Sequence, residues 1–284
     1  QTTAGSIAST NTVTINGRGA LTLAGNNTLA SLGLNNVGGE GAGPTLTPTG
    51  ILTLTSSSPI TATSRNAIVA ATVSGGTLVF TNGGNTIDVG AVAVGSKVYG
   101  TLSPTLNITS VIAGAGAATS VTKTGNGILQ LSGQSTFAGN FNLNAGSLRL
   151  SGNSTSVAGV FGVVSGPVGV GTLNVASGSK LIVGASQSLG NKVSFAGTPT
   201  FDSTVVSAAT LTLNGTLTGI ANGALSVQVD NPYLTVQLLG KIDNIANITS
   251  ISRGGLGRLV FNATGYAGDF NATNLGDTTS VAIY

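Results

Sequence analysis

Side chains that could carry acid–base, nucleophilic or redox chemistry are scarce in this chain. Its 284 residues include ten Lys and Arg and seven Asp and Glu, and they include no His, Cys, Met or Trp. This composition excludes a Ser-His-Asp triad, a cysteine nucleophile, a thiolate zinc site, a haem held by His or Cys, and a disulfide. The residues left for chemistry are the carboxylates Glu40, Asp88, Asp202, Asp230, Asp243, Asp269 and Asp277.

Carboxylate catalysis requires two or three acids gathered on one face. Asp202 and Asp230 are 28 residues apart and could meet on successive coils of a repeat of about 25 residues. Two isolated aspartates in turns are the simpler interpretation, so we expect no catalytic residue. The Asp pattern of calcium-binding nonapeptides is absent, and the glycines of residues 162–171 lack the Gly-Lys-Ser/Thr of a phosphate loop. We therefore expect no metal-binding or cofactor-binding residue and no cofactor.

The distribution of charge and hydropathy excludes several partners. Only 6% of the residues are charged, and the cations stand singly at Arg18, Arg65, Lys97, Lys123, Arg149, Lys180, Lys192, Lys241, Arg253 and Arg258. Nucleic-acid binding needs clustered cations, so nucleic acid is not expected as a partner. Mean hydropathy is +0.40, but residues 157–176, the best membrane candidate, are interrupted by glycines, a serine and a proline. We expect no transmembrane helix.

A short strand motif recurs along the chain. The pentad Gly-x-Leu-x-Leu/Val/Phe begins at Gly19, Gly50, Gly76, Gly127, Gly146, Gly171, Gly223 and Gly257. Side chains alternate between the two faces of a strand, so the third and fifth positions of the pentad should point inward. The glycine should stand where the chain turns into the strand, at a positive φ or a close backbone approach. Several intervals lie near 25 residues or twice that, which indicates stacked units.

A longer match accompanies the pentads. Residues 121–144 align with residues 251–273, and a partial copy covers residues 17–29. The segment from Lys123 to Leu150, KTGNGILQLSGQSTFAGNFNLNAGSLRL, resembles the autotransporter-associated β-strand repeat of bacterial surface proteins. The resemblance implies a right-handed parallel β-solenoid that is exported and exposed on the cell surface.

We therefore predict an all-β fold, a parallel β-solenoid (β-helix) with irregular loop insertions, in one elongated domain over residues 1–284. The clearest repeats are residues 17–29, 121–150 and 251–273. Coils of about 25 residues would give about 11 coils and a rod of about 50 Å. Insertions are expected at residues 35–48, 92–120 and 151–171.

Two β-prone runs without charged residues, 12–15 and 278–284, could dock against copies of the chain. Alternatively, they are the first and last strands of a monomer. The recurring aromatic residues Phe137, Phe141, Tyr266 and Phe270 are expected in the core, whereas a carbohydrate platform would need them outside. Five formal glycosylation sequons, at Asn107, Asn153, Asn247, Asn262 and Asn271, are expected by chance in an Asn- and Thr-rich chain.

The sequence thus predicts an extracellular structural protein on the bacterial cell surface, without enzymatic activity. Low charge weakens the repulsion between copies, so the expected role is a self-associating subunit of a fibre, sheath or layer. The absence of Cys and the start at Gln1 fit an exported, processed chain. The alternatives are a monomeric adhesin or spacer that binds a host or abiotic surface, and a carbohydrate-active β-helix enzyme. Cell-surface polysaccharide is a further candidate partner.

Overall fold

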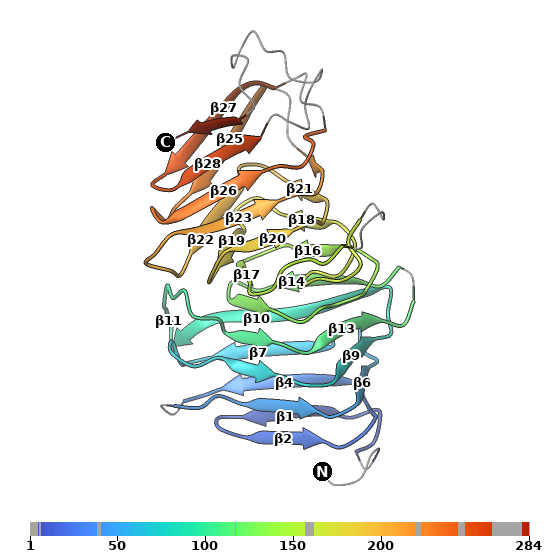
Figure 1. The fold of residues 1–284 in the computed structure, drawn as a ribbon. Helices are drawn as coiled ribbons and strands as arrows, with labels where there is room; N and C mark the ends of the chain where they lie inside the picture. Colours follow the sequence, from blue (N-terminus) through green and yellow to red (C-terminus); the bar gives the residue numbers. More distant parts are fainter. Residues whose placement is uncertain are drawn as a thin grey trace.

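The chain folds into stacked β-strands. The computed structural model describes residues 5, 7–38, 41–116, 118–156, 162–219, 223–243, 248–262 and 280–283. Within these ranges there are 29 strands and no helix. Figure 1 shows the strands piled one above another from the N-terminal to the C-terminal end, as the predicted parallel β-solenoid requires.

Most coils contribute one strand to each of two long sheets, and most also contribute a strand to a third sheet. Sheet 1 contains β1 (Thr12–Asn16), β4 (Ser31–Asn36), β7 (Ile60–Ser64), β10 (Gly84–Val94), β14 (Ser120–Thr124), β16 (Phe141–Leu143), β18 (Leu173–Val175), β21 (Val193–Phe195) and β24 (Leu217–Thr218), with β11 (Lys97–Val98) beside β10. Sheet 2 contains β2 (Ala20–Leu23), β5 (Thr45–Pro48), β8 (Ala71–Val73), β12 (Leu106–Ile108), β15 (Ile128–Leu131), β17 (Ser147–Leu150), β19 (Lys180–Val183), β22 (Thr200–Ser203), β25 (Gly223–Val229) and β27 (Ile248–Gly255).

Two shorter sheets occupy the third position of the coil. Sheet 3, in the early coils, contains β3 (Asn27–Leu29), β6 (Ile51–Leu54), β9 (Thr77–Phe80) and β13 (Val111–Gly114). Sheet 4, in the later coils, contains β20 (Gln187–Leu189), β23 (Ala209–Leu213), β26 (Leu234–Leu238), β28 (Arg258–Asn262) and β29 (Ser280–Ile283). The pairings are parallel, except β10 with β11 and β28 with β29.

One apolar core runs through the stack. It begins with Ile15 and Leu23 in the first coil and reaches Leu259 and Phe261 in the last described coil. The pentad leucines behave as predicted, because Leu129, Leu148 and Leu259 are all 0% exposed. Strand alternation therefore leaves most hydroxyl, amide and charged side chains outside, and Lys123 is a buried exception.

Coil length is not constant, which corrects the expected period of about 25 residues. Leu129 pairs with Leu148 only 19 positions later, whereas Leu148 pairs with Leu181 33 positions later. Because insertions lengthen some coils, the pentads fall on different sheets. Those at Gly127 and Gly146 lead into sheet 2, those at Gly50 and Gly76 into sheet 3, and that at Gly171 into sheet 1.

The predicted insertions are partly strand. Residues 35–48 contain the end of β4 and all of β5, and residues 92–120 contain β11, β12 and β13. The true insertion in the latter segment is a side arm of residues 91–102, in which β11 folds back against β10. Figure 1 shows β11 at one side of the stack. Residues 151–156 and 162–171 form only isolated bridges, as expected of a loop.

The two proposed docking runs are both strands. Residues 12–15 lie in β1, which pairs with β4 on one edge. Within residues 278–284, Ser280–Ile283 forms β29 and pairs with β28 of the same chain. This pairing is the arrangement expected of a terminal strand within one chain.

Candidate functional site

The outer side of sheet 1 forms a long surface of small polar side chains, which we call the hydroxyl–amide face. Strand register aligns its members in rows along the stack. One row runs through β10, β14, β16, β18, β21 and β24, and consists of Thr86, Thr122, Asn142, Asn174, Ser194 and Thr218. A second row consists of Thr14, Gly33, Thr61, Asp88 and Thr124.

Hydrogen bonds connect this face from coil to coil. The amide of Asn174 donates to Asn142 Oδ1 at 2.7 Å, and the amide of Asn142 donates to Thr122 Oγ1 at 3.3 Å. The Asn35 amide donates to Asn16 Oδ1 at 3.1 Å. Such ladders of identical or similar side chains follow from parallel in-register stacking.

The face carries almost no charge. Of the residues in its two rows, only Asp88 is ionisable, and its Oδ1 accepts a 2.7 Å hydrogen bond from Thr124 Oγ1. No residue in the rows is longer than Asn, and Gly33 leaves a shallow trough between Thr14 and Thr61. The surface is therefore low, polar and nearly uncharged, with both hydrogen-bond donors and acceptors.

A charged cluster lies on the outer side of sheet 2. Lys180 Nζ donates to Asp202 Oδ2 at 3.1 Å and to Asp230 Oδ2 at 2.7 Å. Burial lowers the pKa of Lys180, but the hydrogen bonds that its ammonium donates to Asp230 and Asp202 outweigh this effect and leave that pKa above its usual value. Burial acts to raise the pKa of Asp230, yet its hydrogen bonds from Lys180 and Gln228 leave this pKa below its usual value.

The expectation that Asp202 and Asp230 are isolated turn residues is therefore wrong. Asp202 lies in β22, and pairing of Phe201 with Val229 places Asp230 beside it on the next coil. Lys180, which belongs to none of the sequence motifs, joins them from β19. Lys180 and Asp202 are 22 residues apart at outward strand positions, a signal that could have indicated the pair. Among the described residues, no group of three or more acids is close enough to hold a metal ion.

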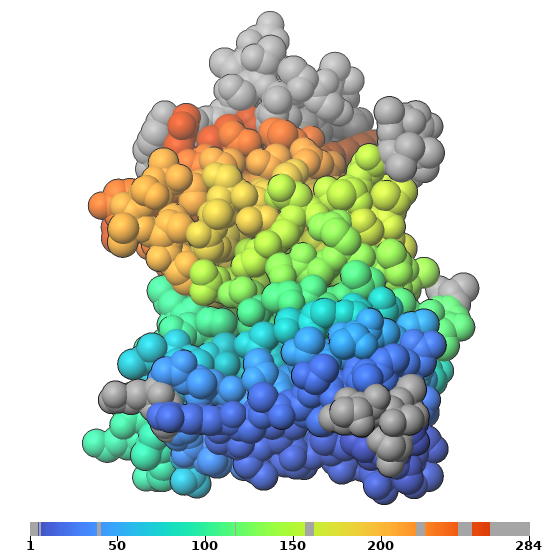
Figure 2. Space-filling model, turned by 60° about the horizontal axis from the view of Figure 1, so that its bottom comes forward, coloured from blue at the N-terminus to red at the C-terminus, as the bar shows by residue number. Residues whose placement is uncertain are grey.

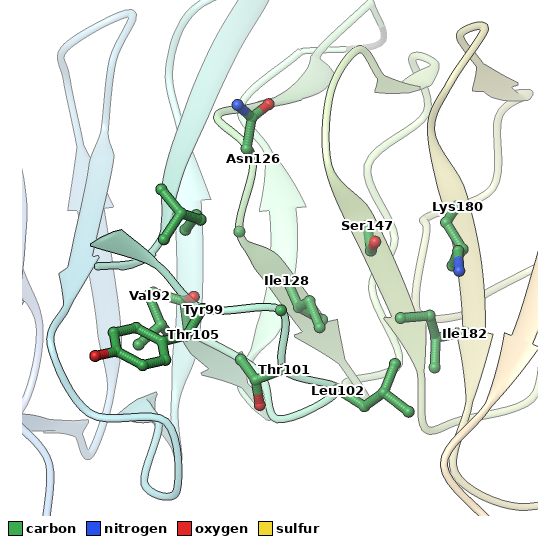
Figure 3. A pocket seen from close by; sticks show the side chains of 14 residues that line it. Val92, Tyr99, Thr101, Leu102, Thr105, Asn126, Ile128, Ser147, Lys180 and Ile182 are labelled. Atoms are coloured by element: carbon green, nitrogen blue, oxygen red, sulfur yellow. The ribbon is translucent and has the colours of Figure 1, made fainter. Parts of the chain in front are cut away.

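A groove lies between the side arm and the outer side of sheet 2. Its volume is about 340 Å³, and it is lined by Ala91, Val92, Val98, Tyr99, Gly100, Thr101, Leu102, Thr105, Asn126, Gly127, Ile128, Ser147, Lys180 and Ile182. Figure 3 shows Leu102 of the arm extending toward Ile182, with Ile128 beside them and Lys180 at the far end. The arm thus forms one wall, and the sheet forms the floor.

Lys123, the first residue of the KTGNG segment, has a structural role. Lys123 is fully buried, and its Nζ donates to the carbonyl oxygens of Gly125 at 2.5 Å and Ala145 at 2.8 Å. Arg253, its counterpart in the second repeat, likewise donates to the carbonyl of Gly255. Both cations therefore stabilise a corner of the coil.

The structure describes some of the recurring aromatic residues and some of the glycosylation sequons. Phe137 and Phe141 are buried in the core, as predicted. Tyr266 and Phe270 lie outside the described residues. Asn107 accepts a 3.2 Å hydrogen bond from Gln130, and Asn153 accepts one from the Ser188 amide. Asn247 and Asn271 lie outside the described part, as does the Asn262 side chain.

Comparisons with known proteins identify no relative of this chain. Family models, curated proteins and solved structures were compared with the chain, and none matches it. Across the part of the chain that the structure describes, no helix has the length and apolarity to cross a membrane.

Proposed function

We propose that this chain is a non-enzymatic, extracellular structural protein of the bacterial cell surface, which associates with copies of itself in a fibre, sheath or layer. The observation that carries the proposal is the hydroxyl–amide face, a flat stack of aligned Thr, Ser and Asn side chains with Asp88 as the ionisable group in its rows. Two such faces can approach closely, because neither row contains a long side chain and each face carries one carboxylate, Asp88, which accepts a hydrogen bond from Thr124.

The charged cluster supports a structural role rather than a catalytic one. A glycosidase-type acid pair needs one carboxyl that is protonated and can donate its proton. Asp230 is instead held ionised by its contact with Lys180, because this contact lowers its pKa. The same ammonium contacts Asp202, so the ammonium is shared between two carboxylates in one ion-pair cluster.

Placing positive charge on the hydroxyl–amide face tests the proposal. Thr61 and Ser194 lie on this face in β7 and β21, and both side chains point outward. The wild-type chain should form regular polymers in negative-stain electron micrographs and sediment as oligomers. The double variant Thr61→Lys and Ser194→Lys should sediment as a monomer, because it opposes like charges across the contact.

A matched control adds the same charge elsewhere. Thr53 and Thr212 point outward from sheets 3 and 4, and Thr53→Lys with Thr212→Lys should assemble like the wild type. A monodisperse wild-type chain at high concentration would instead support the monomeric spacer. Equal loss of assembly in both double variants would exclude the hydroxyl–amide face as the contact.

Cell-surface polysaccharide is a second partner that we propose, and a different observation favours it. The groove beside the arm combines apolar and polar lining residues on a face that the self-association contact leaves open.

A further inference from the structure

The groove crosses several coils and so suits an extended ligand. Ile128, Ser147 and Lys180 are in register on β15, β17 and β19, and all three line it. The groove therefore follows the axis of the stack, in which neighbouring strands lie about 4.8 Å apart. A chain of sugar rings has a repeat of similar size and could place one ring near each strand.

Its floor and wall are apolar where an outer sheet surface is usually polar. Ile128 and Ile182 form part of the floor and are almost fully buried, at 6% and 1% exposed. Opposite them, the arm exposes Val98, Tyr99 and Leu102 at 68%, 47% and 43%. Large exposed apolar side chains gathered in one place mark a binding surface, and the C–H faces of sugar rings can pack against such side chains.

Polar groups at the edge can meet the hydroxyls of the same ligand. Asn126, Thr101 and Ser147 line the groove and offer both donors and acceptors. Lys180 closes the far end, but its ammonium is already bound by Asp202 and Asp230. The nearby ionic groups Arg149, Lys180, Asp202 and Asp230 sum to zero charge, so this surface attracts neither a polyanion nor a polycation.

Other chain-like ligands fit less well. A peptide added as a strand needs an unpaired sheet edge, whereas the floor here is the face of sheet 2, in which β17 is paired on both sides. A nucleic acid needs several free cations, and the cation that lines the groove is paired.

We propose that the groove between the side arm and strands β15, β17 and β19 binds a neutral polysaccharide chain, with its sugar faces on the exposed Val98 and Leu102 of the arm, above the buried Ile128 and Ile182. This inference specifies the polysaccharide part of the proposed function and does not depend on self-association. An acidic polysaccharide should bind more weakly, because the cation in the lining, Lys180, is already held by Asp202 and Asp230.

Isothermal titration calorimetry with defined oligosaccharides tests the proposal. The probes are a neutral β-glucan hexamer, a neutral chitin hexamer and an acidic polygalacturonate hexamer. At least one neutral hexamer should bind with a dissociation constant in the millimolar range or below, and more tightly than the acidic one. Leu102→Ser, an exposed wall position, should weaken this binding about tenfold, as expected for the loss of one apolar contact.

Leu256→Ser provides the control, because Leu256 is also exposed, at 74%, and does not line the groove. It should leave the affinity unchanged. Repeating the titration on the Thr61→Lys and Ser194→Lys variant separates saccharide binding from assembly, since that variant should bind sugar whether or not it polymerises. The proposal is overturned by the absence of neutral binding at millimolar probe, by tighter binding of the acidic hexamer, or by equal effects of the two leucine variants.

Discussion

Lys123 shows how a single residue of the repeat can be structural and still titrate within an accessible pH range. Among the described residues, Lys123 is the one charged residue that is fully buried, and its side chain points into the core from β14. Two carbonyl oxygens, of Gly125 and Ala145, accept its hydrogen bonds. Burial lowers its pKa to about 8, although the charge of Asp88 acts in the opposite direction. The folded chain therefore holds this proton less tightly than the unfolded chain does.

Stability should consequently rise as the pH increases above about 8. Between the folded pKa of about 8 and the unfolded value of 10.5, the unfolded state binds more protons, so the free energy of unfolding increases with pH. One pKa unit corresponds to about 1.4 kcal/mol, so we expect a gain of about 2–3 kcal/mol from about pH 8 to about pH 10. Urea unfolding followed by circular dichroism measures this gain.

Lys123→Met serves as the comparison for this titration. It lacks the titrating group, so its free energy of unfolding should stay nearly level over the same pH range. A wild-type curve that falls between about pH 8 and about pH 10, or a variant curve that rises equally, would contradict the assignment to Lys123.

At the scale of the element, the corners between strands depend on close backbone approach. The pentad glycines are predicted to have a positive φ or to lie at a close backbone approach, and both cases occur. Gly76 and Gly146 have positive φ values of 50° and 66°. Gly127 does not need a positive φ; a Cβ there would overlap the carbonyl of Gly90 on the preceding coil. The Gly127 amide also donates to the Val89 carbonyl at 2.8 Å, which fixes how closely the two coils stack.

Gly127→Ala should therefore destabilise the stack. The new methyl group would meet backbone that cannot move without displacing the neighbouring coil, and overpacking of this kind costs about 2–3 kcal/mol. Gly83→Ala is the matched change, because a Cβ at Gly83 meets nothing within 4 Å. It should change the free energy of unfolding by less than about 0.5 kcal/mol. If the two variants had the same urea midpoint, the close approach of the two coils would not be the reason for a glycine at position 127.

The same elements show what the sequence could and could not predict. Strand alternation is local, so the inward direction of Leu129, Leu148 and Leu259 follows from the pentad alone. Coil length depends on insertions such as the arm, and these decide which sheet a given strand joins. The groove and the Lys180 cluster arise from pairing between distant coils, with Lys180 and Asp230 50 residues apart in sequence. Alternation predicts that Lys180 and Asp202 point outward, but it does not show which coils lie side by side.

At the scale of the whole molecule, the outer faces of the stack carry different kinds of side chain. The core is continuous from Ile15 to Phe261, so each coil is stabilised by its neighbours rather than by a separate centre. Sheet 1 presents the nearly uncharged hydroxyl–amide face, and sheet 2 presents the charged cluster and the groove. Figure 2 shows blue-green residues of the middle coils projecting at one side of the N-terminal coils. Assembly through one face and ligand binding on another are therefore compatible in one rod.

This division makes the proposed assembly insensitive to salt. Contacts through ionic groups weaken when the screening length falls to about 3 Å, near 1 M salt. The rows of the hydroxyl–amide face contain one ionisable residue, Asp88, which is engaged by Thr124. The net charge of the chain is only +3, so long-range repulsion between copies is also small. Sedimentation velocity should give the same oligomer distribution at low salt and at about 1 M NaCl. Dissociation at high salt would place the contact on the charged side of sheet 2 instead.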